Sequence, residues 1–306
     1  MQNQPLVSVI IPTYKREVFF VSRAVNSVLL QTYPHLQLIV IDDSPSDFEH
    51  RGAVAEFMRS LNDNRVIFLQ NEKNMGGSLA RNRGIDIAEG EYITFLDDDD
   101  EYLPSKIENQ IRFMRESDCD LSFSDMRMYN NSGSIVDCRT YADIPSFDNG
   151  TLLRYHLMKH MTGTPTFMYK TDMLREIGGF EDAKMGQEFY LMLKSIERGL
   201  KIAYLPQCDV KIYKHAAGGI TQGKNKINGE NRLYEFKKKY FPCLSSKEIR
   251  FINFRHWAVM VVAYKRNKQI YLMPYAGIRA FFSSPKDFFS EIIRFLKKIN
   301  NAKNGR

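Results

Sequence analysis

Residues 90–100 read Gly-Glu-Tyr-Ile-Thr-Phe-Leu-Asp-Asp-Asp-Asp, an apolar run that ends in four consecutive aspartates. The apolar part, Tyr92 to Leu96, has the length and composition of a buried β-strand. Four adjacent carboxylates repel one another and raise each other's pKa, so the run is costly unless a cation neutralises it. The stretch therefore predicts a strand whose carboxyl end carries an acidic site.

Three similar apolar runs precede this strand, and helical patterns lie between the runs. The strand-like runs are Val7–Ile11, Leu36–Ile41 and Val66–Leu69, and the helical patterns are Val18–Gln31, Phe48–Leu61 and Gly77–Ala88. Strands that alternate with helices form βαβ units in a mainly parallel sheet. We therefore expect an α/β fold, a mixed and mainly parallel nucleotide-binding sheet flanked by helices, with ligands beyond the carboxyl ends of its strands.

A second acidic pair, Asp42-Asp43, follows the second strand, where it could accept hydrogen bonds from the ribose or base of a nucleotide. Taken alone, each acidic site also has an ordinary explanation. Asp42-Asp43 could cap a helix that starts near Asp47. The run Asp97–Asp100 could be a solvated loop, or a cap for the helix expected after Pro104.

Four motifs occur in a fixed order along the chain. They are VSVIIPTY at 7–14, IVIDDS at 39–44, NMGG at 74–77 with ARNRG at 80–84, and GEYITFLDDDD at 90–100. Their order and spacing resemble a family 2 glycosyltransferase with the GT-A fold, of the kind that builds bacterial surface polysaccharides such as O-antigen or capsule. The resemblance covers about Pro5 to Gly219.

The resemblance implies binding roles for single residues. The nucleotide-sugar contacts that it implies are Thr13, Tyr14, Asp42, Asp43, Arg81, Asp97 and Asp98. Asp97 and Asp99 would be the outer letters of an Asp-x-Asp motif, with Asp99 as the direct ligand of Mn²⁺ or Mg²⁺. Carboxylate oxygens suit such hard cations. Asp100 could serve only as a cap for the next helix.

A later segment, residues 178–191, resembles the part of the family in which two acidic residues open a helix. The second of these acts as general base in inverting members and falls here on Glu188, while Gln187 stands where an acid is common. A carboxylate in the first turn of a helix is stabilised in its ionised form by the helix dipole, so it can take a proton from an acceptor hydroxyl. The alternative is a capping acid on a surface helix.

Two further sites rest on the resemblance alone. His215 falls where the family often has a histidine near the donor diphosphate, which would make it a secondary metal or diphosphate ligand; a lone histidine is more often an ordinary polar residue. Thr162–Thr166 precedes a strand on the acceptor side, or is a plain turn.

The charge distribution divides the chain into two parts. From Lys224 to the end there are 19 lysines and arginines against 5 acidic residues, whereas residues 1–223 carry a net charge of −7. We expect a catalytic domain over 1–223 and a helical, basic and aromatic extension over 224–306. Helices of this kind suit an anionic membrane surface, although they could also be ordinary helices packed on the core.

The composition is that of a folded protein, with 43% hydrophobic and 26% charged residues, and it excludes a disordered or fibrous chain. No apolar run is long enough to span a bilayer, and no signal peptide is visible. The four scattered cysteines form no metal pattern. We therefore expect a cytoplasmic protein, peripheral on the inner face of the membrane.

Together these features predict an inverting, metal-dependent hexosyltransferase. It would move a sugar from a nucleotide-diphosphate sugar, such as UDP-glucose, to a hydroxyl of a glycan or lipid-linked acceptor, and no nucleic acid is expected as a partner. One alternative is a sugar nucleotidyltransferase, although Tyr14-Lys15-Arg16-Glu17 lacks the glycines of a phosphate loop. The other is a non-catalytic module that binds nucleotide sugars or nucleic acid through the basic tail.

Overall fold

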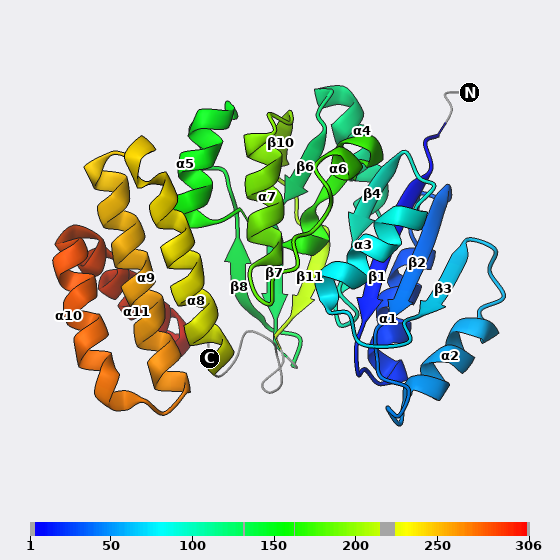
Figure 1. The fold of residues 1–306 in the computed structure, drawn as a ribbon, viewed down its shortest axis with the longest axis horizontal. Coiled ribbons are helices and arrows are strands. Elements are labelled where there is room, and N and C mark those ends of the chain that lie inside the picture. Colours follow the sequence, from blue (N-terminus) through cyan, green and yellow to red (C-terminus); the bar gives the residue numbers. More distant parts are fainter. Residues whose placement is uncertain (1–3, 131, 162, 215–223, 305–306) are drawn as a thin grey trace. The chain divides into compact units, whose positions relative to one another are not determined.

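The computed structural model describes residues 4–130, 132–161, 163–214 and 224–304. The chain forms two compact units (Figure 1). The first consists of Met1–Leu153 with Met161–Ala217, and the second of Arg154–His160 with Gly218–Arg306. The sequence did not predict that Arg154–His160, the second half of helix α5 (Asn149–Lys159), belongs with the second unit.

The first unit is built on a seven-stranded sheet in the order β10-β6-β9-β4-β1-β2-β3. Its strands are β1 (Val7–Thr13), β2 (Leu36–Asp42), β3 (Val66–Gln70), β4 (Tyr92–Phe95), β6 (Leu121–Ser124), β9 (Met168–Lys170) and β10 (Ile202–Leu205). Strand β9 runs antiparallel to β4 and β6, while the other neighbouring pairs are parallel. The expected mixed, mainly parallel sheet is confirmed.

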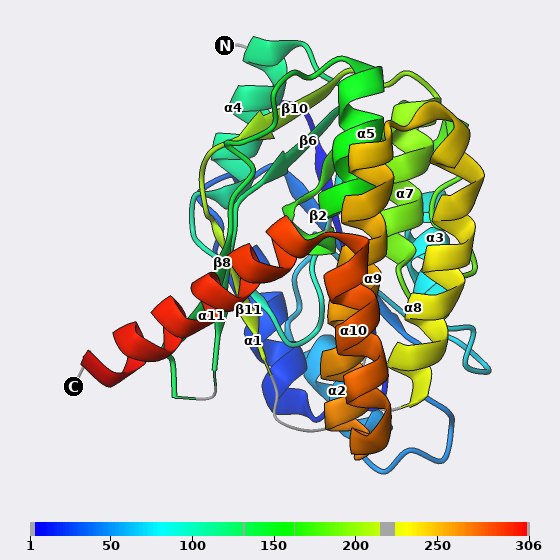
Figure 2. The same ribbon diagram turned by 90° about the vertical axis from the view of Figure 1, so that its left-hand side faces the viewer.

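Helices cover both faces of this sheet, which is why its central strands are apolar on both sides. Figure 2 shows α1 (Val18–Leu29) and α4 (Lys106–Ser117) on one face, and α3 (Gly77–Ile87) and α7 (Gln187–Glu197) on the other. The remaining helices are α2 (Arg51–Ser60), which packs against α1, and α6 (Thr171–Glu176), which packs against α3. Every residue of β2 is buried.

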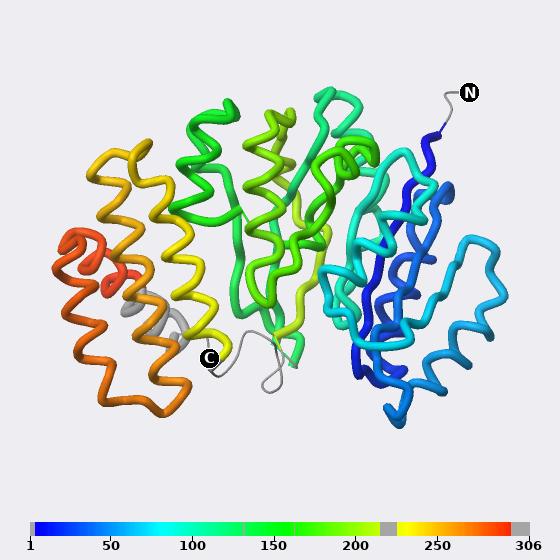
Figure 3. Tube along the Cα trace, in the orientation of Figure 1, coloured from blue at the N-terminus to red at the C-terminus, as the bar shows by residue number. Residues whose placement is uncertain are grey.

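The order of the strands reverses beside β1. The chain runs outward from β1 through β2 to β3, then returns to place β4 on the other side of β1 (Figure 3). Such a reversal opens a crevice at the carboxyl ends of the strands, where open α/β sheets bind their ligands. The ends of β1 and β4 therefore locate the candidate site.

A smaller sheet of four strands has the order β5-β11-β7-β8. Its strands are β5 (Glu101–Tyr102), β7 (Met126–Tyr129), β8 (Ile135–Arg139) and β11 (Val210–Tyr213). The sequence of residues 120–141, with turn-forming residues at 130–133, predicts a strand pair, and β7 and β8 do form an antiparallel hairpin. The prediction was incomplete, because residues 121–124 form a third strand, β6, in the larger sheet.

The second unit is helical, as the pattern of the tail predicted. Its helices are α8 (Lys224–Lys237), α9 (Ser246–Arg266), α10 (Met273–Ser283) and α11 (Pro285–Asn304), with short 3₁₀ turns at Lys238–Cys243 and Ile270–Leu272. A capping box starts α9, where Ser245 and Glu248 satisfy each other's backbone amides. None of the helices in the described ranges combines the length and hydrophobicity that a membrane crossing requires.

Buried polar side chains join the helices of the second unit. Lys237 is only 5% exposed, and its Nζ lies 2.5 Å from Nε2 of His160. Glu230 and His256 are also buried, with 3.8 Å between Oε1 of Glu230 and Nδ1 of His256. Burial lowers the pKa of Lys237 to about 7, although the Glu230 carboxylate opposes this shift.

The entry into β4 leaves no room for a side chain at Gly90. A Cβ there would lie 2.5 Å from the backbone nitrogen of Ser8, and the Gly90 amide already donates to the Ser8 hydroxyl. We expect Gly90→Ala to lower the free energy of unfolding by about 1–3 kcal/mol, the usual cost of overpacking. Gly52→Ala is the control, because nothing lies within 4 Å of its Cβ and Ala favours helix. Urea unfolding followed by circular dichroism compares them, and equal stability of both variants would contradict the prediction.

Titration of Lys237 makes the stability of the second unit depend on pH. An unfolded lysine keeps a pKa near 10.5, so between about pH 7 and pH 10 the unfolded chain binds more protons, and stability rises with pH. In Lys237→Met we expect this rise to shrink by several kcal/mol. Denaturant unfolding followed by fluorescence of Trp257, the single tryptophan, measures it. The exposed Lys247→Met should keep the wild-type rise, and an unchanged rise in Lys237→Met would refute the assignment.

Candidate functional site

The four aspartates form the turn between β4 and β5. The backbone amide of Leu96 still donates to the Ile10 carbonyl of β1, and the Asp100 amide then donates to the Asp97 carbonyl at 3.1 Å. The acidic run thus lies at the predicted place, at the carboxyl end of β4 and beside the end of β1. Beneath it, the Tyr102 hydroxyl donates to the Phe95 carbonyl, and the buried Lys106 ammonium donates to Tyr102 and Thr94.

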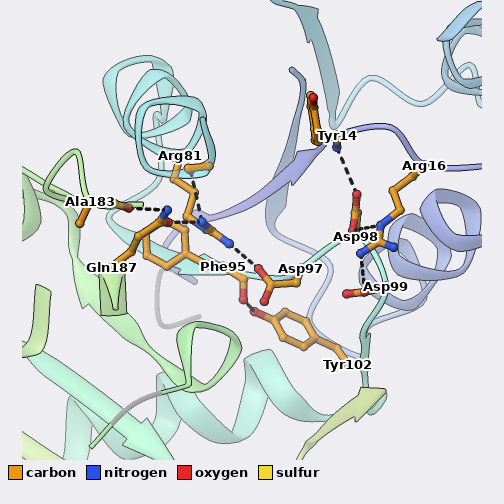
Figure 4. A network of polar contacts seen from close by, with 11 residues as sticks. Tyr14, Arg16, Arg81, Phe95, Asp97, Asp98, Asp99, Tyr102, Ala183 and Gln187 are labelled. Carbon is orange, nitrogen blue, oxygen red and sulfur yellow. Dashed lines mark hydrogen bonds and ion pairs between the residues drawn. The ribbon is translucent and has the colours of Figure 1, made fainter. Parts of the chain in front are cut away.

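Arg16 neutralises the middle of the acidic turn. Its guanidinium, in the loop after β1, donates through Nε to Asp98 at 2.9 Å and through Nη2 to Asp99 at 2.5 Å (Figure 4). The backbone amide of Tyr14 also donates to Asp98, at 3.3 Å. Asp98 is only 7% exposed, and burial raises its pKa to about 6 although Arg16 opposes the rise. Asp98 is therefore a buried anchor for the loop 14–16.

Arg81 neutralises Asp97 at the start of the acidic turn and also bonds the first residue of α7. From α3, its Nη2 donates to Asp97, while its Nη1 lies 2.9 Å from Oε1 of Gln187, the first residue of α7 (Figure 4). Gln187 in turn donates to the Ala183 carbonyl at 3.0 Å. Asp97, with 37% of its side chain exposed, is more accessible than Asp98 or Asp99.

Asp100 does not cap the next helix, so that interpretation was wrong. Helix α4 begins at Lys106 after Ser105, whereas the Asp100 carboxylate accepts the backbone amide of Tyr213 in β11 at 2.9 Å. Strand β5 lies between the acidic turn and α4, so Asp100 is too far from the start of the helix to cap it. Burial and the charges of Asp97 and Asp99 raise its pKa well above the usual range.

Asp42 and Asp43 hold the loops beyond β2 and β3. The Asp43 carboxylate accepts hydrogen bonds from the Asn71 side chain and from the amides of Met75 and Gly76, at 2.6–2.8 Å. Asp42 accepts from the Ser44 amide and the Gln70 side chain. Neither caps a helix near Asp47, because α2 begins only at Arg51 after His50.

Thr13 and Tyr14 lie at the end of β1, next to this acidic turn. Thr13 is buried, and its hydroxyl helps to lower the pKa of Asp98. The Tyr14 side chain is 43% exposed, so its ring is available to a ligand at the carboxyl edge of the sheet. Of the predicted nucleotide contacts, Thr13, Tyr14, Arg81, Asp97 and Asp98 are thus connected through the turn, while Asp42 and Asp43 support a neighbouring loop.

Glu188 lies in the first turn of α7, directly after Gln187. The helix is entered through Gly186, whose φ of +79° is a left-handed conformation that favours glycine. Glu188 is half-buried, and within the described part of the chain its carboxylate forms no hydrogen bond or ion pair. Gln187, the residue before Glu188, is connected to Asp97 of the acidic turn through Arg81.

Sequence reasoning missed three residues of this network. Arg16 and Gln187 bond the site residues directly, and Arg23 from α1 donates to the Asp99 carbonyl and pairs with Glu101 at 3.2 Å. A signal existed for Arg16, because it follows the carboxyl end of β1 by three residues and an acidic cluster needs cations. Gln187 was noted only as a departure from the family pattern.

The donor set of the turn fits a hard divalent cation that shares its ligands with a phosphate. Such cations are usually held by one or two carboxylates plus phosphate oxygens. In the described ranges no three His, Cys, Asp or Glu side chains gather to hold a metal by themselves. Asp97 and Asp99 could supply the two protein carboxylates. His215, the third predicted ligand, lies outside the described residues.

The chain is similar in sequence to several known glycosyltransferases. An uncharacterized glycosyltransferase of Methanocaldococcus jannaschii is 28% identical over 200 residues, which is 65% of this chain and 67% of that protein. WfaP of Escherichia coli, named as a UDP-Glc:α-D-GlcNAc-diphosphoundecaprenol β-1,3-glucosyltransferase, is 28% identical over 222 residues, 72% of this chain and 82% of WfaP. Other curated relatives match over a smaller share of their length, 37% and 52% in two cases.

A solved structure supports the fold. Residues 1–349 of TarS from S. aureus, in complex with UDP-GlcNAc, match with a TM-score of 0.58 at 19% identity, covering 90% of this chain and 88% of that one. The sequence model described as glycosyl transferase family 2 matches residues 8–178, from β1 past the acidic turn. Since that match spans more than half of the 306 residues, the chain belongs to glycosyl transferase family 2 and is a glycosyltransferase.

Proposed function

We propose that the enzyme moves a sugar, with inversion, from a UDP-sugar to a hydroxyl of a glycan or lipid-linked acceptor in surface-polysaccharide assembly. The observation that carries this is the network in which Arg81 bonds both Asp97 of the acidic turn and Gln187, the neighbour of Glu188. It joins a site suited to a diphosphate to a carboxylate suited to a base. The UDP donor and lipid-linked acceptor are suggested by the name of WfaP and by the ligand of TarS.

Arg16 and Arg81 are the groups that would meet the negative charge of the donor. Both are partly buried, so their charges are screened less than those of surface arginines, and both are already oriented by carboxylates. Thr13, Tyr14, Asp42 and Asp43 would contact the base and ribose, and Asp98 would fix the loop that carries Tyr14. Preorganised charge of this kind stabilises a leaving diphosphate without reorganisation during the reaction.

Asp99 and Asp97 would hold Mn²⁺ or Mg²⁺, with His215 as a further candidate ligand. When bound, the cation would neutralise charge on the departing diphosphate. In this structure Arg16 bonds the Asp99 carboxylate and Arg81 bonds the Asp97 carboxylate, so each carboxylate is oriented by its own arginine.

Glu188 is the proposed general base. As the acceptor oxygen attacks the anomeric carbon, the bond from that carbon to the diphosphate oxygen breaks, and the acceptor proton passes to the Glu188 carboxylate. Glu188 lies in the first turn of α7, at the end of the helix where the helix dipole favours negative charge. In the described part of the chain the Glu188 carboxylate has no bonded partner that an acceptor hydroxyl would have to displace.

We further propose that residues 1–223 form the catalytic domain and that 224–306 form an extension toward a membrane-borne acceptor. The opposite net charges of these two parts support this division.

A screen of nucleotide sugars with Mn²⁺ or Mg²⁺, measuring release of the nucleotide diphosphate, tests the function directly. With the donor so found, we expect Asp99→Asn to lose about 100-fold or more of the metal-dependent rate, the usual effect of removing one charge-stabilising contact. Asp172→Asn, at an exposed carboxylate of α6, should keep the wild-type rate. A folded Asp99→Asn variant with near-normal activity would refute the metal assignment. If no donor is consumed, with or without lipid-linked acceptors, the proposed function fails.

Glu188→Gln separates chemistry from donor binding. The amide keeps the size of the side chain but cannot take a proton, so we expect turnover to fall by about 10²–10⁴-fold while UDP binding changes little. Single-turnover transfer and calorimetric titration with UDP measure the two effects. Glu197→Gln, at the exposed end of the same helix, is the matched control. Unchanged turnover would move the base elsewhere, with Glu181 and Asp182 next to be tested.

A further inference from the structure

Helix α10 exposes large apolar side chains to solvent and buries small ones. Its buried positions are the small residues Ala276 and Ala280, which are 0% and 1% exposed. Tyr271, just before the helix, and Tyr275, Ile278 and Phe282 within it are 52–76% exposed. A surface helix normally buries its large apolar residues and presents polar ones.

These exposed residues form one continuous stripe. Positions 271, 275, 278 and 282 are spaced by four, three and four residues, so they share one side of the helix. The opposite side of α10, with the buried Ala276 and Ala280, packs on α9. Trp257 of α9 meets the edge of the exposed side, where its ring centroid lies 5.5 Å from that of Tyr275. We call Tyr271, Tyr275, Ile278 and Phe282 the α10 stripe.

The first turns of α11 also carry exposed apolar side chains. Phe289, Ile292 and Ile293 are 40–56% exposed, and Phe289 contacts Phe281 of α10 with ring centroids 6.0 Å apart. Figure 2 shows α11 running away from α8, α9 and α10 toward the C-terminus. Large apolar side chains exposed on two successive helices mark an interaction surface.

The positive charges around the α10 stripe indicate which kind of partner would bind it. From Ile249 to Lys286 the sequence contains no aspartate or glutamate. The exposed charges flanking the stripe are Lys265, Arg266 and Lys268 before it, Arg279 within it and Lys286 after it. A second copy of the chain would bring five more positive charges against these, whereas an anionic lipid surface complements them.

We propose that the α10 stripe inserts into the surface of an anionic phospholipid bilayer, with the flanking lysines and arginines on the lipid headgroups. The helix would lie in the plane of the interface, as amphipathic helices with an aromatic apolar face and basic flanks do. Tyrosine suits this depth, because its ring is apolar and its hydroxyl is polar. Docking through this surface does not depend on which sugar the enzyme transfers.

Co-sedimentation of the full chain with vesicles tests the proposal. Vesicles of phosphatidylglycerol with phosphatidylethanolamine should bind the wild type, and vesicles of phosphatidylcholine alone should bind it at least about tenfold more weakly. Ile278→Ser/Phe282→Ser should lower the partition coefficient by about tenfold or more. The control is Leu30→Ser/Ile135→Ser, because Leu30 and Ile135 are 76% and 53% exposed, against 76% and 56% for Phe282 and Ile278.

Further measurements separate the possible results. Quenching of Trp257 fluorescence by brominated lipids should occur in the wild type and be lost in the stripe variant. Light scattering determines whether the chain is a dimer, and release of nucleotide diphosphate without vesicles should be equal in the wild type and both variants. If the stripe variant binds vesicles as the wild type does, or if the stripe instead holds a dimer that binds no vesicles, the proposal is wrong. Equal binding to phosphatidylcholine would contradict the role of the basic flanks. Loss of donor turnover in all proteins would count against the proposed function and not against docking.

Discussion

Repulsion among the carboxylates of Asp97–Asp100 is the constraint on which the site depends. The chain meets it with cations from separate elements, Arg16 from the loop after β1 and Arg81 from α3. Asp100 is instead buried, with a backbone amide of β11 as its donor. Neutralising one short turn thus brings the loop after β1, α3 and β11 into contact with the residues that follow β4.

The sheet and the place of the acidic site could be predicted because both depend on local pattern. Continuous apolar runs identified β1, β2, β3 and β4, and the polar residues after them were bound to meet at one edge. Residues 121–124 were harder to place, because the sequence of a four-residue strand such as Leu-Ser-Phe-Ser does not show which sheet it joins. The role of Asp100 depended on the short strand β5, which no periodicity revealed.

The contact between Arg81 and Gln187 could not be identified from sequence spacing. The two residues are 106 positions apart, and only the tertiary fold brings their side chains together. In the second unit, likewise, the interleaving of basic and aromatic residues was visible, but the exposed face of α10 was not. Ala276 and Ala280 are small enough for close contact with α9, and this packing turns the larger side chains outward. Tertiary packing, and not composition, decides which apolar residues remain at the surface.

The amide at position 187 shares its cation with the acidic turn. Arg81 bonds the Gln187 side chain through Nη1 and the Asp97 carboxylate through Nη2, and Glu188 is the next residue along α7. The end of β4 and the start of α7 are therefore both held by one guanidinium, although the two segments are far apart in the sequence. A substitution at position 81 would leave both segments without the contact they share, so the integrity of the two depends on a single side chain.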